Sequence, residues 1–153
     1  GRPDAPPARC LRRDVGKPLM FVDASALVTL LADEPEAGRI STALASANRC
    51  RTSPVAILET VLALARPDKF DMTVEAVGPI VLEFLEARGI EICDLPPANA
   101  TTALALSAAH RYRAGRHGLN LGDCLHYAAA RFFNVPILAT ADEFRRTDLE
   151  TVP

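Results

Sequence analysis

The sequence predicts an α/β domain in which helices cover both faces of a parallel sheet. Leu19–Val22 is an apolar run without alternation, which is typical of a strand that is buried on both faces. Pro136–Ala139 is a second run of this kind, and between the two, short strand-like segments alternate with longer segments of helical period. This alternation favours a parallel sheet, because parallel neighbours need a long crossover connection, which is usually a helix.

The length and composition indicate one folded domain. The chain has 153 residues, of which 49% are hydrophobic and 24% charged, as in ordinary globular proteins. Residues 1–18 contain four prolines and four arginines and show no apolar period. We therefore expect a flexible extension over residues 1–18, a native start near Met20, and one domain over residues 19–153.

The charge and cysteine content exclude several classes of protein. The net charge of −2 means that the chain does not bind nucleic acid by overall charge, so such binding needs a local basic patch or a bound metal. The four cysteines show no zinc-binding spacing, so we expect free thiols and a cytoplasmic protein. No apolar run reaches the roughly 18 residues of a membrane span.

The first half of the domain shows three helix signals and a second strand. Apolar residues at helical spacing follow Asp23 up to Leu31, and Glu34-Pro35 predicts a cap with proline at the first position of the next helix. After a strand at about 49–52, Ser53-Pro54 predicts another capped helix. One apolar stripe is expected on that helix, with Glu59 at its border, formed by Val55, Leu58, Val61, Leu62 and Ala65.

The second half continues the alternation. A helix is expected over 73–88 with a kink or break at Gly78-Pro79, followed by a strand over 90–94 and a helix over 98–114. After a glycine-rich loop, a helix starts at Asp123, and the fourth strand is Pro136–Ala139.

Four acids lie beside apolar core sequence rather than on a polar face: Asp23, Glu59, Asp123 and Asp142. Two of them follow strands, and the carboxyl ends of parallel strands face the ligand crevice of an open α/β sheet. Two carboxylates about 4 Å apart repel each other by about 4 kcal/mol at an effective dielectric constant of 20, so such a cluster needs a cation. Oxygen ligands alone favour Mg²⁺ or Mn²⁺ over zinc.

Each acid also has a structural interpretation. Asp123 can cap a helix, and Asp142 can cap a turn. Asp94 also lies near a strand end, but for this residue we prefer the structural interpretation. Among the three histidines, His126 has the best position for a metal ligand, one helical turn after Asp123, although we expect no histidine in the metal site.

The chain resembles the PIN-domain ribonucleases, and among them the VapC-type toxins of bacterial toxin–antitoxin pairs. The resemblance covers about Leu19 to Val152 and rests on Met20–Leu27, Ser53-Pro54 with Glu59, Leu119–Cys124 with Tyr127–Ala130, and Pro136–Phe144. It implies a three-layer α/β/α sandwich with a central parallel sheet. It also implies that Mg²⁺ or Mn²⁺ is held by the acidic quartet Asp23, Glu59, Asp123 and Asp142.

The same resemblance assigns supporting positions. Ser25 and Thr140 match residues that often hydrogen-bond to an acid or to a metal-bound water in this family. The chain departs from the family at Thr140-Ala141-Asp142, where relatives often carry Asn or Gly before the last acid. Asp148 is therefore an alternative for the fourth acid.

We expect a metal-dependent endoribonuclease, the toxin of a toxin–antitoxin pair, that cleaves RNA by a metal-activated water and leaves 5′-phosphate and 3′-hydroxyl ends. The resemblance further implies a cognate antitoxin protein and a homodimer. Arginines that precede Asp123 or follow Asp142 are candidates for binding RNA phosphates: Arg111, Arg113, Arg116 and Arg145.

Other interpretations remain. An aspartyl phosphatase of the haloacid dehalogenase type fits poorly, because Ser25 stands where a second Asp is needed and no Lys follows Lys69. Nucleotide-binding glycine loops are absent from the sequence. A non-catalytic PIN-fold regulatory or binding module and a phosphoester hydrolase with another substrate are the remaining alternatives.

Overall fold

The structure is a computed structural model that describes residues 19–153, so the extension predicted for residues 1–18 lies outside the described residues. Its centre is a sheet of five parallel strands in the order β3-β2-β1-β4-β5, with β1 in the middle. The strands are β1 (Leu19–Val22), β2 (Arg49–Thr52), β3 (Ile90–Ile92), β4 (Ile137–Leu138) and β5 (Thr151–Val152).

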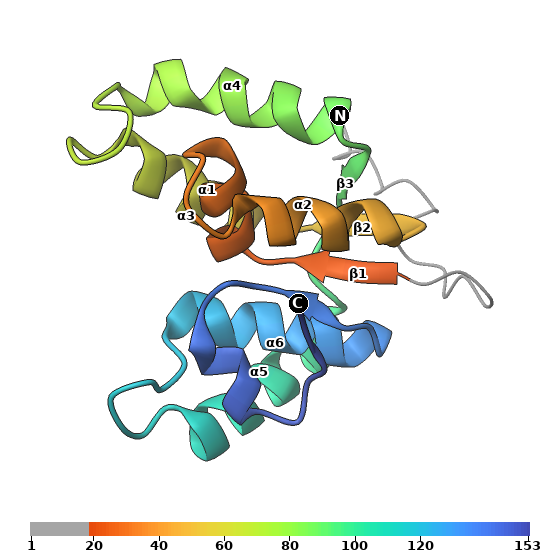
Figure 1. Ribbon diagram of the computed structural model, residues 1–153. Helices are drawn as coiled ribbons and strands as arrows, with labels where there is room; N and C mark the ends of the chain where they lie inside the picture. Colours follow the sequence, from red (N-terminus) through yellow and green to blue (C-terminus); the bar gives the residue numbers. More distant parts are fainter. Residues whose placement is uncertain (1–18) are drawn as a thin grey trace, which may run out of the picture.

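Helices cover both faces of this sheet (Figure 1). In that view α1 to α4 lie on one side of β1, and α5 and α6 lie on the other. The predicted three-layer α/β/α sandwich is therefore confirmed. The helices are α1 (Ala24–Leu31), α2 (Ala37–Ser46), α3 (Pro54–Ala65), α4 (Val74–Ala87), α5 (Ala98–Tyr112), α6 (Leu121–Phe133) and the 3₁₀ helix η2 (Asp142–Arg146).

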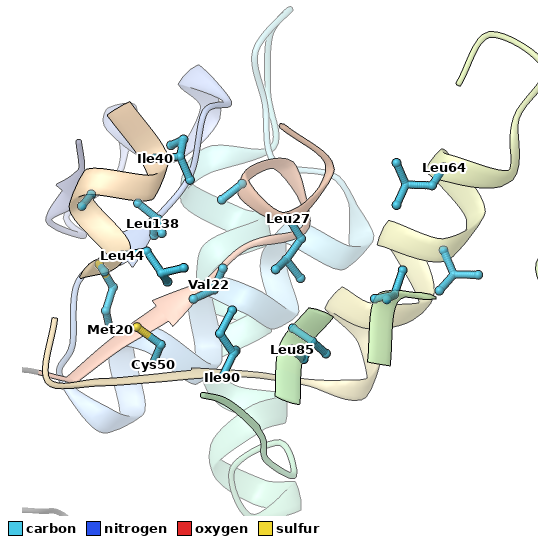
Figure 2. Close-up of a cluster of buried hydrophobic side chains, with 14 of the residues drawn as sticks. Met20, Val22, Leu27, Ile40, Leu44, Cys50, Leu64, Leu85, Ile90 and Leu138 are labelled. Carbon is cyan, nitrogen blue, oxygen red and sulfur yellow. The ribbon is translucent and has the colours of Figure 1, made fainter. Parts of the chain in front are cut away.

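Alternate residues of the central strand supply two hydrophobic cores. Met20 and Val22 belong to the core that also contains Leu27, Ile40 and Leu138 (Figure 2). Phe21 belongs to a second core with residues of α5, α6 and η2. Because side chains of a strand alternate between its faces, β1 is buried on both sides, which explains its unbroken apolar sequence.

The strand register brings two chain segments to one edge of the sheet. Val22 of β1 is paired with Leu138 of β4, and the backbone N–H of Asp23 donates to the Leu138 carbonyl at 3.0 Å. The residues that follow these two strands therefore leave the sheet side by side, at its carboxyl end.

Two predicted helix starts are wrong. The second helix begins at Ala37 rather than after Glu34, because Asp33 has a left-handed φ of 49° and the Glu34 N–H bonds to the Thr29 carbonyl in a tight turn. The last long helix begins at Leu121 with Asn120 as its N-cap, so Asp123 lies in its first turn.

The face of α3 that is buried also differs from the predicted stripe. Leu58 and Leu62 are 57% and 51% exposed, whereas Ala56, Thr60 and Leu64 are fully buried. The small Ala56 and Thr60 let α3 lie close to its neighbours, and the Thr60 hydroxyl donates to the Ala56 carbonyl at 2.7 Å.

Three of the predicted free thiols can be assessed, and all three are confirmed. Cys50, Cys93 and Cys124 are unbridged and buried. Burial raises the pKa of the Cys50 thiol to about 11, against an opposing effect of Arg88, so this thiol stays protonated. Across residues 19–153, every helix is too short or too polar to span a membrane.

Candidate metal and RNA site

A cavity of about 360 Å³ opens at the carboxyl edge of the sheet, where β1 and β4 end and α6 begins. Of the four predicted acids, Asp23, Glu59 and Asp123 line it, and so do both predicted supporting residues, Ser25 and Thr140. Five chain segments contribute to its wall. The remaining lining residues are Ala24, Val28, Thr29, Glu34, Ala63, Asn120, Ala141 and Glu143.

Asp23 is fixed by the start of α1. Its Oδ2 accepts from the Ser25 N–H at 3.0 Å, which makes it the N-cap of that helix. Its Oδ1 is buried and has no hydrogen-bond partner among residues 19–153. The Ser25 hydroxyl accepts from the Thr140 N–H at 3.0 Å and so joins the segment after β4 to the start of α1.

Asp123 is placed by a capping box at the start of α6. The Asn120 side chain accepts from the Asp123 N–H at 2.8 Å, and Asp123 Oδ2 accepts from the Asn120 N–H at 3.1 Å. Asp23 and Asp123 therefore both lie at helix N-termini, where the backbone dipoles favour negative charge.

The surroundings of Asp123 nonetheless disfavour its ionised form. The pKa of Asp123 is raised to about 6: burial raises it most, the bond to the Asn120 backbone lowers it, and the negative charges of Asp23 and Glu143 raise it. The charge of His126 opposes these two acids. The raised pKa therefore reflects a buried carboxylate that also has other acids nearby.

Glu59 reaches the cavity from α3 and contacts the buried His126 of α6. The Glu59 carboxylate is hydrogen-bonded to His126 Nε2, which also lies 3.7 Å from Asp23 Oδ1. Burial alone lowers the pKa of His126, but the bond to Glu59 and the charges of Asp23, Glu59 and Asp123 outweigh burial and raise it above 6.5. We expected no histidine in the metal site. His126 nonetheless contacts two of the predicted acids, Glu59 and Asp23.

The fourth predicted acid, Asp142, does not line the cavity. Its side chain is 72% exposed and lies 3.8 Å from Arg145 Nε. The next residue, Glu143, lines the cavity, and within residues 19–153 its Oε2 is buried without a hydrogen-bond partner. The sequence signal was ambiguous because η2 is a tight 3₁₀ turn, in which adjacent residues point in very different directions.

The two alternative acids also lie elsewhere. Asp94 is exposed after β3 and is absent from the cavity wall. Asp148 accepts from the Tyr127 hydroxyl at 2.7 Å and lies 3.4 Å from Arg131 Nε, in the last turn of α6, whereas Asp123 lies in its first turn. Neither residue is placed to join Asp23.

The four candidate RNA-binding arginines fall into two groups. Arg111 donates to the Tyr127 hydroxyl at 2.5 Å, and Arg145 donates to the Pro153 carbonyl at 3.0 Å. Arg113 and Arg116, at the start of the loop before α6, form no ion pair with any residue of the range 19–153. Arg113 lies close enough to Cys124, the neighbour of Asp123, for its charge to lower the thiol's pKa, although burial raises that pKa overall.

The donors in this cavity fit a hard divalent cation. In the described part of the chain, two carboxylate oxygens are buried without a hydrogen-bond partner, Asp23 Oδ1 and Glu143 Oε2, and both residues line the cavity. As the side chains stand, no three of the Asp, Glu, His and Cys residues in 19–153 are grouped closely enough to hold a metal ion. A cation here would need the acids to move closer together, and its charge would offset their repulsion.

The chain has clear relatives. The family model described as PIN domain matches residues 20–149. Ribonuclease VapC30 of Mycobacterium tuberculosis is 36% identical over 136 residues, which cover 87% of this chain and 98% of the relative. A VapC ribonuclease of Rhizobium meliloti is 31% identical over 142 residues, which cover 86% of this chain and 99% of the relative.

Solved structures share the fold. The crystal structure of Mycobacterium tuberculosis VapC20, described as a toxin that cleaves the sarcin-ricin loop, matches with a TM-score of 0.64 and 19% identity over 88% of this chain and 99% of that one. A toxin–antitoxin complex from Klebsiella pneumoniae matches with a TM-score of 0.64 and 13% identity over 88% of this chain and 96% of that one. From its sequence, its sheet topology and these relatives, the chain belongs to the PIN-domain family, among the VapC ribonucleases.

Proposed function

We propose that this protein is a metal-dependent endoribonuclease that acts as the toxin of a toxin–antitoxin pair. The observation that carries the proposal is the cavity at the carboxyl edge of the sheet. It collects Asp23, Glu59, Asp123 and Glu143, and two of their oxygens are buried without a partner. Membership of the VapC ribonucleases supports RNA as the substrate, since the relatives are named for that activity.

The residues that would hold Mg²⁺ or Mn²⁺ are Asp23, Asp123 and Glu143, with Glu59 beside them. Such a cation, when bound, lowers the pKa of a water and neutralises charge on a phosphodiester. A cation at this site would favour the ionised form of Asp123, whose pKa is raised to about 6, chiefly by burial and also by neighbouring acids. Ser25 and Thr140 keep the segment after β4 joined to Asp23, so they hold the wall of the site in place.

Phosphate binding is assigned to the loop before α6. Arg113 and Arg116 carry guanidinium groups that can grip phosphate oxygens in pairs. Arg111 and Arg145, the other two candidates, already have acceptors within the chain, so we assign them a smaller part in RNA binding.

We also propose a cognate antitoxin protein, a homodimer and a cytoplasmic location. The proposal of an antitoxin follows the fold neighbours whose structures are toxin–antitoxin complexes. Two leucines on α3, Leu58 and Leu62, are largely exposed one turn apart and offer apolar surface for a protein contact.

The test is cleavage of 5′-labelled RNA by the purified protein with Mg²⁺, Mn²⁺ or EDTA, with Asp23→Asn beside the wild type. Cleavage should need the metal, leave 5′-phosphate ends and vanish in the variant. Asp94→Asn is the matched control, because Asp94 also follows a strand but lies outside the cavity. Cleavage that resists EDTA, or ends that carry a 2′,3′-cyclic phosphate, would contradict the mechanism, since a cyclic phosphate requires attack by the ribose hydroxyl.

A further inference from the structure

We propose that Gly122 and His126 of α6 are positioning residues that hold the Glu59 carboxylate in the site. The proposal rests on the nuclease function above and adds two residues to it. Glu59 differs from the other acids because it comes from α3, on a long side chain that is 33% exposed. A free glutamate side chain samples many rotamers, and fixing one of them costs conformational entropy, so a defined position needs specific contacts.

Gly122 provides the space for this carboxylate. A Cβ atom built on Gly122 would lie 2.7 Å from Glu59 Cδ and 2.9 Å from Oε1, closer than real Cβ contacts. The backbone gives no other reason for a glycine: Gly122 lies in the first turn of α6 without a left-handed φ. In a helix, alanine is favoured over glycine, so this position gives up some helix stability and gains close contact with Glu59.

His126 provides the hydrogen bond on the other side. It follows Gly122 by four residues and so lies on the same face of α6, one turn further along. Its ring is fully buried, and it lies 5.7 Å from the Phe21 ring, centroid to centroid, so packing fixes its direction. Nε2 of this ring is the atom bonded to Glu59.

The other ring nitrogen shows that packing alone does not explain a histidine here. His126 Nδ1 is buried without a hydrogen-bond partner in the described residues. Such an atom costs stability, and an apolar ring of similar size would avoid that cost. The contribution of the imidazole therefore lies at Nε2, where it bonds Glu59 and lies near Asp23.

These contacts place Glu59 in a slot between Gly122 and His126. Gly122 acts through Glu59 alone, so its substitution should matter only while the carboxylate is present, whereas His126 also lies near Asp23. This consequence separates a positioning role from a general contribution to the stability of α6.

The experiment is a double-mutant cycle. Gly122→Ala and His126→Phe are made in the wild type, and Gly122→Ala is also made in the Glu59→Ala background. Mn²⁺ affinity is measured by calorimetry, and kcat and KM are measured with RNA. Gly122→Ala should weaken Mn²⁺ binding and lower kcat by roughly tenfold, the lower end of the effect of supporting residues at metal sites, with little change in KM. In the Glu59→Ala background the same substitution should change neither quantity more than about twofold.

Two controls keep the result specific. Gly38→Ala adds a Cβ to another helical glycine, on α2, where nothing lies within 4 Å, and should leave Mn²⁺ affinity unchanged. His126→Gln keeps an N–H donor and should recover part of the affinity that His126→Phe loses. If His126→Phe does not fold, as judged by circular dichroism, the Gly122 cycle decides.

The outcomes distinguish this inference from the proposed function. Equal losses from Gly122→Ala with and without the Glu59 carboxylate, or full Mn²⁺ affinity in folded His126→Phe, would overturn the positioning role. A wild type that binds Mn²⁺ but cuts no RNA would instead contradict the nuclease, and the affinity cycle would still decide the roles of Gly122 and His126.

Discussion

Two groups of acids meet helix α6, and their surroundings differ. Toward the C-terminus of α6, which we call the paired side, Asp148 is bonded to the Tyr127 hydroxyl and lies 3.4 Å from Arg131 and 3.9 Å from Arg111. At its N-terminus, which we call the cavity side, Asp23, Asp123 and Glu143 line the cavity, and within residues 19–153 no Lys or Arg lies within 4 Å of their carboxylates.

The two environments shift the pKa of an aspartate in opposite directions. Burial by itself raises the pKa of Asp148, but the bond from Tyr127 and the charges of Arg111 and Arg131 lower it overall. Burial and neighbouring acids raise the pKa of Asp123 to about 6. An acid that the chain supplies with its own cations stabilises the fold, whereas a cluster without such cations is suited to bind one from solution.

The largest expected effect separates these two roles directly. Asp123→Asn should lower RNA cleavage by about 1,000-fold, or about 4 kcal/mol in transition-state stabilisation, because a neutral amide is a poor ligand for a divalent cation. Asn at this position can still accept from the Asn120 N–H, so the metal-free variant should melt at or above the wild-type temperature. Asp148→Asn should show the converse, with cleavage within about twofold of wild type and a lower melting temperature. A loss of cleavage in both variants would remove the distinction.

The second prediction, with a smaller effect on cleavage, tests which of two adjacent acids, Asp142 or Glu143, belongs to the site. Glu143→Gln should lower cleavage by roughly 100-fold, since it replaces a carboxylate that faces the metal-binding cluster. Asp142→Asn, one residue earlier, should change cleavage by no more than about twofold, because its side chain is 72% exposed. Single-turnover rates on one RNA measure both. A large loss of cleavage in Asp142→Asn with little loss in Glu143→Gln would instead support Asp142 as the fourth acid of the site.

Substitution on the paired side, at Tyr127, should lower the free energy of unfolding and leave RNA cleavage unchanged. Tyr127→Phe removes a hydroxyl that accepts from Arg111 and donates to Asp148, both of them charged. Bonds to charged groups contribute about 1.5–3 kcal/mol when buried, and Asp148 is partly exposed, so a loss of about 1–2 kcal/mol in the free energy of unfolding is expected. Urea denaturation measures it. An unchanged midpoint, or a loss of cleavage by the folded variant, would contradict a purely structural role.

The sequence predicted the elements that depend on strong local signals. An unbroken apolar run marks β1, and Ser53-Pro54 marks the start of α3, whose cap accepts from the Ala56 N–H as expected. The short strand β5 was missed, because two residues with half-buried side chains carry no apolar run. Its pairing with β4 depends on the tertiary structure around it.

For the candidate site, too, the sequence predicted the residues that depend on local signals and missed those that depend on tertiary contacts. Asp23 and Thr140 follow strands, so the rule for parallel sheets brings them to one edge without further information. The choice between Asp142 and Glu143 depends on the direction of a 3₁₀ turn, which no periodicity reveals. The slot at Gly122 depends on the approach of α3 to α6, a contact between distant parts of the chain.

The pH dependence of stability gives the smallest effect and tests the comparison without RNA. A carboxyl group whose pKa is raised on folding binds its proton more tightly in the folded chain, so protonation stabilises the fold. For Asp123, with an ordinary pKa of 3.8 raised to about 6, the metal-free protein should gain on the order of 1 kcal/mol as the pH falls from 7 to 5.

His126 should add to this gain with the same sign. A histidine whose pKa is raised on folding contributes stability that is fully present below 6.5 and is lost as the pH rises through the raised value. The lowered pKa of Asp148 acts outside this window, because its contribution is present above 3.8 and is lost only as the pH falls through the lowered value. Between pH 5 and 7, therefore, the cavity side changes its contribution and the paired side does not.

Urea denaturation of metal-free protein at several pH values measures this slope, with Asp123→Asn and Asp148→Asn as the matched pair. Asp123→Asn should flatten the slope, and Asp148→Asn should leave it as in the wild type. Saturating Mn²⁺ should reverse the trend, because the cation competes with the protons of the acids and stabilises the folded state more at pH 7 than at pH 5. If Asp123→Asn kept the full slope, the concentration of uncompensated charge would lie elsewhere in the chain, and the contrast between the two sides of α6 would lose its electrostatic basis.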